Sequence, residues 1–322
     1  MRSIFNILLV VLSGLTLAGC TPIEAYQAIG STDRTPPIVT GGFATSERSI
    51  KIICNETVRI QNETFGLSEG LMITDISVSE NSILIETENP LVPGSEYILE
   101  GVLSDLSGNT ALLTMAVYGW NPDPPVLIIN EFTTKGSKRH PDAIELLVIE
   151  DGNMAGLTLY DGISDDYRQR CIFPPLEVHT GEYVIIHCSD IPESFESIPE
   201  DHQFSMGESI GLSGNNGAIS LYTSAHGEVL DAVIYSNRSS DSDTDYLGFG
   251  SRSLMFKVHQ LHAVGIWDSL TPEGAVRTDS MTATRSACRN DPYKDTDSSR
   301  DWHTVPTSSS SFGEDNCNEI YQ

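Results

Sequence analysis

The sequence predicts an all-β protein made of two antiparallel β-sandwiches in tandem, with a short helix in an insertion of the second. Three observations predict this class. Short segments rich in Ile and Val alternate with turn residues along most of the chain. A proline-rich linker at residues 121–125 divides these segments into two groups. The length of 322 residues suits about two domains.

The first element is a secretory signal peptide, which we place at residues 1–19. Arg2 gives it a positive start, and residues 4–17 are an apolar run too short to span a membrane. The run ends in Leu17-Ala18-Gly19-Cys20, which resembles a bacterial lipobox. That resemblance implies cleavage before Cys20 and acylation of its thiol. The alternative is an ordinary signal peptide followed by a chance cysteine.

The lipidated Cys20 and a polar tether occupy residues 20–35, and the first sandwich follows at 36–120. Six short strands separated by turns are the number expected of an antiparallel sandwich. Cys54 ends an apolar strand and is expected to be a small buried hydrophobe. The predicted strands are residues 38–43, 49–54, 72–78, 82–86, 97–103 and 112–118.

Several motifs in this region resemble the bacterial Ig-like domain of surface-layer proteins. They lie at residues 35–39, 50–58, 91–97 and 103–109, and the last of them closes in a D-x-x-G-N turn. One departure is Cys54, at a position where we expect an aromatic residue. The resemblance implies a spacer or interaction sandwich without catalysis.

The second half, residues 126–317, resembles a lamin-tail domain, and residues 318–322 form a tail. The motifs are I-N-E, D-x-I-E-L, L-x-L-Y-D, G-E-Y-V-I-I and a late D-W, in that order. The closing Thr-Pro-Gly turn of the family is replaced here by a serine-rich segment at 307–313. The resemblance implies an Ig-like β-sandwich. In bacteria such domains occur on exported and envelope-attached proteins, alone or beside enzymes.

An insertion at residues 236–285 interrupts this pattern. A Ser/Asp loop at 236–245 precedes residues 251–266, where Leu254, Val258 and Leu261 recur at helical spacing. We expect a short amphipathic helix packed on the sandwich. Whether the insertion forms a site is left open.

Five cysteines remain beyond Cys20, so at least one is unpaired within the chain. Cys171 and Cys188 flank a predicted hairpin whose alternation points both thiols at one core, which favours a disulfide. Cys288 and Cys317 are the natural second pair. The alternative for the first pair is two buried free thiols.

We expect no catalytic residue, metal site or cofactor. The CxxC, CxxH, HExxH, G-x-S-x-G and phosphate-loop patterns are missing from the sequence. Acidic loops, paired histidines and two strand glutamates are weighed as sites, but solvated loops, packed imidazoles and hydrogen-bonding groups are preferred. These residues are Asp241, Asp243 and Asp245; Asp295, Asp297 and Asp301; His226, His259, His262 and His303; and Glu131 and Glu145.

The chain is strongly acidic, with 45 Asp and Glu against 18 Lys and Arg and a net charge of −27. Such charge argues against nucleic-acid binding, which depends on Lys and Arg. We therefore expect a lipid-anchored envelope protein for display, spacing or protein binding. Its expected partners are the membrane, through Cys20, and envelope or extracellular proteins. The alternatives are a targeting or accessory subunit of an envelope hydrolase and, less favoured, a metal-dependent hydrolase.

The lipobox generates the first testable prediction. Cys20→Ser removes the thiol that is acylated, so the protein should move from the detergent phase to the aqueous phase on phase partition. Two or more acyl chains are needed for stable anchoring, since each buried methylene adds about 0.8 kcal/mol. An unchanged membrane fraction would contradict lipid anchoring. Thr21, rather than Asp, follows Cys20, and we therefore expect the outer membrane.

Overall fold

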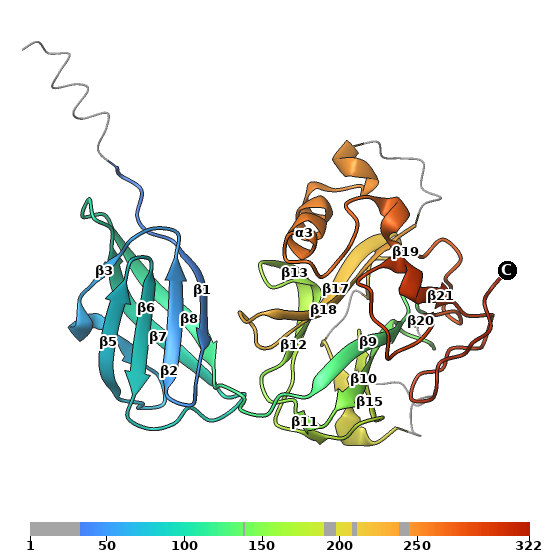
Figure 1. Cartoon of the computed structure of the whole chain (residues 1–322), viewed down its shortest axis with the longest axis horizontal. Coiled ribbons are helices and arrows are strands. Elements are labelled where there is room, and N and C mark those ends of the chain that lie inside the picture. Colours follow the sequence, from blue (N-terminus) through green and yellow to red (C-terminus); the bar gives the residue numbers. More distant parts are fainter. Residues whose placement is uncertain (1–32, 138, 190–197, 208–210, 238–244) are drawn as a thin grey trace, which may run out of the picture.

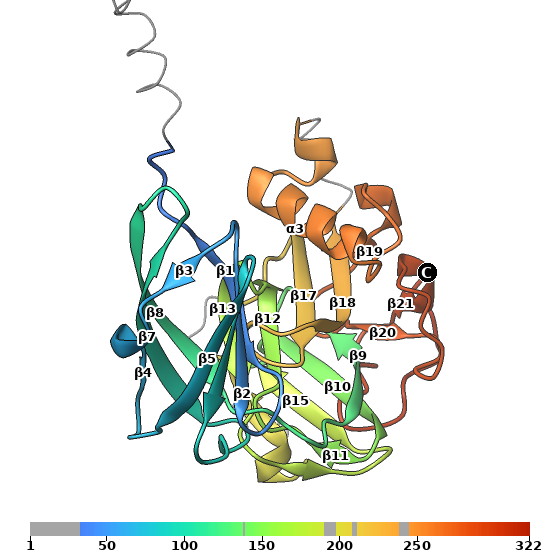
Figure 2. The same cartoon turned by 60° about the vertical axis from the view of Figure 1, so that its left-hand side comes forward.

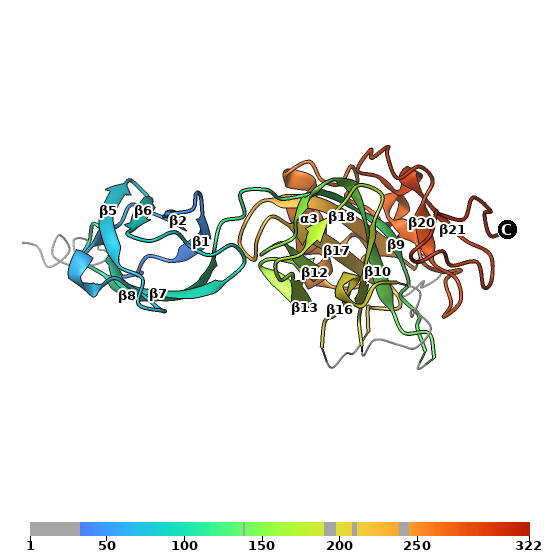
Figure 3. The same ribbon diagram turned by 90° about the horizontal axis from the view of Figure 1, so that it is seen from below.

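The computed structural model describes residues 33–322 except 138, 190–197, 208–210 and 238–244. These residues form mostly antiparallel sheets, with two parallel strand pairs, and one α-helix, α3 (Arg252–Ala263), which confirms the predicted all-β class. Two β-rich bodies lie side by side along the long axis, joined by one stretch of chain (Figures 1 and 3). Across the described part of the chain, no helix is both long and apolar enough to cross a membrane.

The first sandwich consists of two four-stranded layers. One has the order β1-β2-β6-β5, and in the other β7 pairs with β3, β4 and β8. Ile83 and Ile85 on β6 alternate with more exposed residues and face a core that also contains Cys54. Its strands are β1 (Val39–Ala44), β2 (Ser49–Cys54), β3 (Arg59–Ile60), β4 (Gly66–Leu67), β5 (Ile73–Ser79), β6 (Ser82–Thr87), β7 (Glu96–Ser104) and β8 (Thr110–Tyr118).

The second sandwich packs a six-stranded sheet against a five-stranded sheet. The orders are β16-β15-β10-β9-β20-β21 and β13-β12-β17-β18-β19, and β11 pairs with β14 alongside. The first sheet contains β9 (Val126–Phe132), β10 (Ala143–Glu150), β15 (Tyr183–His187), β16 (Gln203–Ser205), β20 (Ala287–Arg289) and β21 (Trp302–Thr304). The remaining strands are β11 (Gly152–Asn153), β12 (Thr158–Ile163), β13 (Asp166–Ile172), β14 (Glu177–Val178), β17 (Asn216–Tyr222), β18 (Val229–Ser236) and β19 (Val276–Arg277).

The central strands of the second sandwich are buried on both faces. Six successive residues of β9 and six of β10 are buried, so the outer face of this sheet is covered as well. Ile144 and Leu146 face the main core, whereas Ala143 packs on the outer side with Ile185 and Phe312. Polar side chains on the outer face must therefore find partners inside the protein.

The predicted helix is present as α3. Ser251 caps it by accepting a hydrogen bond from the Leu254 amide, and Leu254, Val258 and Leu261 are buried against the sandwich as the helical spacing indicates. Figure 2 shows α3 beyond one end of β17 and β18. The helix therefore covers an end of the second sandwich.

The predicted hairpin between Cys171 and Cys188 is wrong. Cys171 lies on β13, which pairs with β12, whereas β15 pairs with β10 and β16 in the opposite sheet. The connecting residues contain Pro174 and Pro175, which lack amide donors, and they carry the chain from one sheet to the other. The alternation of apolar residues correctly predicts that both thiols face the core. The predicted pairing of their two strands is the part that is wrong.

The connection between the sandwiches is bonded to the second of them. The Asn121 side-chain amide donates to the carbonyl oxygens of Asn153 and Ala155. In addition, Gly94 and Gly156 come so close that a Cβ added to Gly94 would lie 2.9 Å from the Gly156 nitrogen, and both glycines have positive φ. A larger side chain at Gly94 would push the two sandwiches apart.

Candidate functional site

The predicted lipidation site and part of the acidic loop lie outside the described residues. These are Cys20, Asp241 and Asp243. Asp245 begins a short 3-10 turn that contains Tyr246 and Leu247, both with positive φ.

The histidines considered as possible metal ligands lie in separate local environments. His262 on α3 bonds through Nδ1 to the carbonyl oxygen of Trp267 at 2.9 Å, and His259 on the same helix is exposed. His303 bonds to the Asn290 side chain and to the Cys317 carbonyl. Among described residues, none of these histidines belongs to a group of three or more potential metal ligands.

The first sandwich contains an acidic triad that the sequence analysis did not predict. Asp33, Glu56 and Asp105 bring one carboxylate oxygen each within 4.8 Å of the others. Asp105 accepts hydrogen bonds from the backbone and side-chain amides of Asn109, and Asn109 also donates to the carbonyl of Asp33. Asn109 therefore links the D-x-x-G-N turn to the incoming chain, and Glu56 adds a third carboxylate beside them. The D-x-x-G-N motif was visible in the sequence, but its proximity to residues 33 and 56 was not.

Glu131 and Glu145, weighed as an acid–base pair, do come together. They are opposite each other across β9 and β10, and both are completely buried. Glu131 accepts hydrogen bonds from the Ser286 hydroxyl and from the Ser311 amide and hydroxyl, the last at 2.7 Å. Glu145 accepts from the Gly313 amide and from the Asn130 side chain at 2.7 Å.

The covering element is a segment that we call the C-terminal strap, residues 310–317. Its Ser311 and Gly313 amides bond the two carboxylates, and Phe312 packs on Ala143 and Ile185. Asn316 exchanges two hydrogen bonds with Asn130, each of 2.8 Å. The strap thus supplies the donors that let the outer face of β9 and β10 carry two carboxylates.

Burial and mutual repulsion set the protonation of this pair. Burial raises the pKa of Glu145 well above its ordinary value, and the nearby Glu131 carboxylate raises it further. Burial also raises the pKa of Glu131, although hydrogen bonds from Ser286 and Ser311 oppose this. Since every described partner of the pair is an internal group, the pair works as a structural anchor for the strap.

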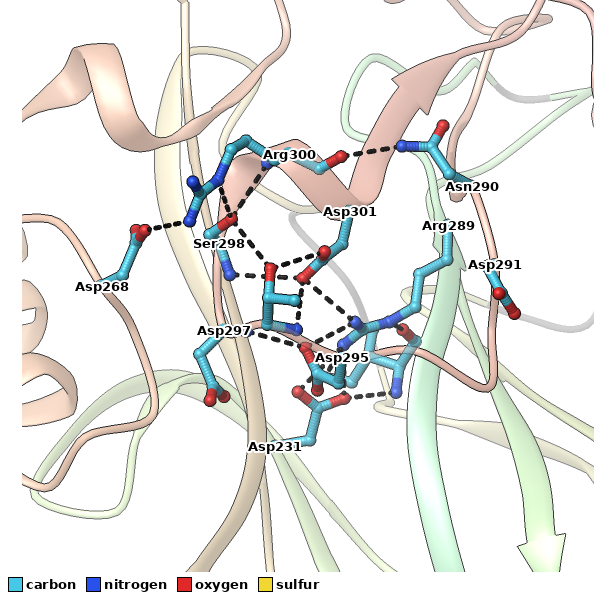
Figure 4. A network of polar contacts seen from close by, with 12 residues as sticks. Asp231, Asp268, Arg289, Asn290, Asp291, Asp295, Asp297, Ser298, Arg300 and Asp301 are labelled. Atoms are coloured by element: carbon cyan, nitrogen blue, oxygen red, sulfur yellow. Dashed lines mark hydrogen bonds and ion pairs between the residues drawn. The ribbon is translucent and has the colours of Figure 1, made fainter.

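A second polar network surrounds Arg289 (Figure 4). The guanidinium is 1% exposed and forms ion pairs with Asp231 at 3.1 Å, Asp295 at 2.8 Å and Asp301 at 3.9 Å. It also donates through Nε to the Ile129 carbonyl and lies 4.9 Å from the centre of the Trp302 ring. This network contains Asp295 and Asp301, two of the residues weighed as a calcium loop.

Arg289 compensates for the burial of its partners. Burial raises the pKa of Asp231 to about 6 even though Arg289 opposes the shift. Burial also acts on Asp295, but there the hydrogen bond and charge of Arg289 prevail and the pKa is lowered. Asp301 accepts from the Thr296 amide and hydroxyl. Two of the three aspartates considered as calcium ligands, Asp295 and Asp301, therefore bind Arg289 and a neighbouring turn instead.

All five described cysteines have free thiols, so the expected disulfides are not formed in this structure. Burial raises the pKa of Cys171 to about 12 and that of Cys188 as well. Cys288 lies near Cys317, with its sulfur 3.7 Å from the Cys317 carbonyl oxygen. The hairpin argument for the 171–188 pair fails because the two strands belong to different sheets.

Residues 125–209 and 193–304 match the family model TP_1001_2nd, described as a protein second domain. The two ranges together cover more than half of the chain. The chain belongs to this family. The matched region begins at the end of the chain segment that connects the two sandwiches. It includes the Arg289 network, together with Glu131 and Glu145.

One relative of this TP_1001_2nd chain is an uncharacterised protein of Treponema pallidum (strain Nichols). The two are 26% identical over 159 residues, which are 45% of this chain and 40% of the relative. The match therefore spans less than half of the relative's length.

Two solved structures overlap part of the fold at low scores. The N-terminal part of the bacterial S-layer protein SbsC gives a TM-score of 0.27 and 14% identity, over 66% of this chain and 45% of that one. Dimeric latent PorU from Porphyromonas gingivalis gives 0.17 and 12%, over 67% and 21%. These scores are too low to indicate a shared function.

The buried pair of Glu131 and Glu145 should make the stability of the protein depend on pH. Because the pKa of Glu145 is raised on folding, the folded state holds its proton more tightly, and stability is lost as the pH rises through the folded pKa. Glu145→Gln removes the repulsion and keeps an oxygen for the Gly313 amide, but its NH2 group then faces the Asn130 amide, which donated to the carboxylate. We therefore expect the Tm of the variant to fall by about 2–4 °C less than that of the wild type between pH 5 and pH 8.

The matched control for this measurement is Glu150→Gln, an exposed position on the same strand. It should leave the Tm and its pH dependence unchanged. If Glu145→Gln shows the wild-type pH dependence between pH 5 and 8, repulsion within the pair does not affect stability.

Substitution of Arg289 should cause a large loss of folding stability. Arg289→Met keeps an apolar side chain but leaves buried aspartates without their cation, which typically costs about 3–5 kcal/mol. Arg300→Gln is the control, since Arg300 is 77% exposed, pairs with Asp268 at the surface and donates from Nε to the Ser298 hydroxyl. Its expected cost is below about 1 kcal/mol. Urea unfolding compares the two, and equal effects would contradict the central role of Arg289.

Proposed function

We propose that the protein is a lipid-anchored envelope module that displays, spaces or binds other proteins without turnover. The observation that carries this proposal is the inward orientation of its strongest polar groups. Glu131, Glu145 and Arg289 are all buried and bonded to internal partners. Their chemistry is used to hold strands, a strap and a loop in place.

The order of the elements supports a spacer. An acylated Cys20 would be followed by a polar tether and then by two rigid sandwiches in series. The connection is bonded through Asn121, and the close glycines Gly94 and Gly156 hold the sandwiches against each other. Such an arrangement would present the second sandwich at a fixed distance from the first.

The lamin-tail resemblance and the negative charge support two further parts of this proposal, the kind of partner and the place of anchoring. A lamin-tail module on an exported chain suits attachment to, or recognition of, envelope proteins. The net charge of −27 repels anionic lipid surfaces, which favours a body that stands away from the membrane. We propose the outer membrane as the site of anchoring.

The test uses acyl-free chain 21–322 as bait on solubilised envelope proteins of the source bacterium. The expected result is a defined envelope protein retained at a stoichiometric ratio and released by excess free chain. Calorimetric titration with Zn²⁺, Mg²⁺ and Ca²⁺, together with assays on peptidoglycan and protein substrates, tests the hydrolase alternative. Metal-dependent hydrolysis that is lost with metal removal would overturn the proposal.

A further inference from the structure

A cavity of about 430 Å³ lies beside the C-terminal end of α3, and its volume is within the range of small-molecule sites. Its walls come from the turn between β12 and β13, the end of β17 with the turn into β18, and the last residues of α3 with the segment that follows them (Figure 1). None of its described lining residues belongs to the C-terminal strap or to the Arg289 network. The cavity is therefore separate from both of the buried polar networks.

The floor of the cavity is apolar. Ile163 and Leu261 are 2% and 1% exposed and belong to the main core of the second sandwich. Val229 and Ile266 are partly buried and pack against the same core. Val264, at the end of α3, is 61% exposed. A hydrocarbon chain that enters the cavity therefore removes apolar surface of both molecules from water.

Tyr222 supplies an unused hydrogen-bonding group. It is 8% exposed, and it pairs with Val229 across β17 and β18, so both side chains lie on one face of the hairpin and line the cavity. Its ring meets the Tyr160 ring edge-on, with the two centroids 5.3 Å apart. Among the described residues, no group bonds the Tyr222 hydroxyl, and this oxygen is not one of the unbonded polar atoms that are sealed from solvent. Because a buried phenol usually has a partner, the hydroxyl is open to a molecule in the cavity.

The charge around the cavity is negative. Asp165 and Glu228 line it from two different turns, both are exposed, and the described part of the chain gives neither carboxylate a hydrogen bond or an ion pair. No Lys or Arg is among the described lining residues, and the negative end of the 12-residue helix α3 borders the same space. Burial and Arg170 lower the pKa of the neighbouring His226, although Asp165 opposes the shift, so this imidazole is mainly neutral near pH 7. The two carboxylates are therefore left for a cation from outside the protein.

We propose that this cavity binds a small aliphatic diamine, a ligand that is independent of the display function. One ammonium group pairs with Asp165 and the other with Glu228, and one of them donates to the Tyr222 hydroxyl oxygen. The methylene chain between them lies on the floor formed by Ile163 and Leu261. The apolar floor disfavours a hydrated metal ion, and the unpaired carboxylates disfavour an anion. The insertion that carries α3 thus completes a ligand site on the second sandwich.

The test titrates the full-length protein with cadaverine by calorimetry at about 150 mM NaCl, where the more distant surface charges of this acidic chain are screened. Saturable binding with a Kd below about 1 mM is expected. Pentylamine, which has one ammonium group, should bind more weakly. Mg²⁺, which has the same charge as the diamine without its methylene chain, should not displace cadaverine at equal concentration. Binding that does not saturate by about 10 mM cadaverine, or equal displacement by Mg²⁺, would exclude a diamine site.

Two variant pairs assign the contacts. Tyr222→Phe removes only the hydroxyl and should weaken binding about tenfold, since hydrogen bonds to charged groups are the stronger ones. Its control is Tyr167→Phe, because Tyr167 is 41% exposed and does not line the cavity. Glu228→Gln should weaken binding about fivefold. Glu150→Gln, the same charge change at an exposed residue outside the cavity, should leave the affinity unchanged. Circular dichroism checks the fold of each variant. Wild-type affinity in a folded Tyr222→Phe protein, or equal losses in the two glutamate variants, would refute the assignment.

Discussion

The guanidinium group of Arg289 joins parts of the second sandwich that no sheet hydrogen bond connects. It stands on β20 in the six-stranded sheet, yet it pairs with Asp231 on β18 in the five-stranded sheet. It also fixes the loop that carries Asp295 and Asp301, and it lies beside the Trp302 ring. The two layers pack together through the apolar core, and one buried cation links them in addition; removing it alone would leave buried aspartates unpaired.

Much of the fold follows from local patterns in the sequence. Period-two alternation of apolar residues locates six of the eight strands of the first sandwich and misses only the two-residue strands β3 and β4. The spacing of Leu254, Val258 and Leu261 locates α3. Strand pairing was less accessible, since residues 173–182 have the composition of a hairpin loop but cross between sheets. Alternation reports which face a residue occupies, whereas the partner strand depends on the whole topology.

The polar sites show where such reasoning stops. Glu131 and Glu145 could be recognised as unusual, because each interrupts an apolar strand. Their structural role depends on hydrogen bonds from Ser311 and Gly313, which lie in a serine-rich segment without periodicity. Likewise, Asp161 is an ordinary strand residue in the sequence. Only the structure shows that it is 3% exposed and pairs with Arg168 at 3.5 Å.

The C-terminal strap also affects the order in which the chain can fold. Glu131 and Ser311 are 180 residues apart in the sequence, and closing so long a loop is slow compared with forming local hairpins. In the first sandwich, β1, β2 and β6 pair over much shorter separations. During synthesis, the first sandwich can therefore fold while the second still has two carboxylates facing solvent. The second can become native only after its strap has been made.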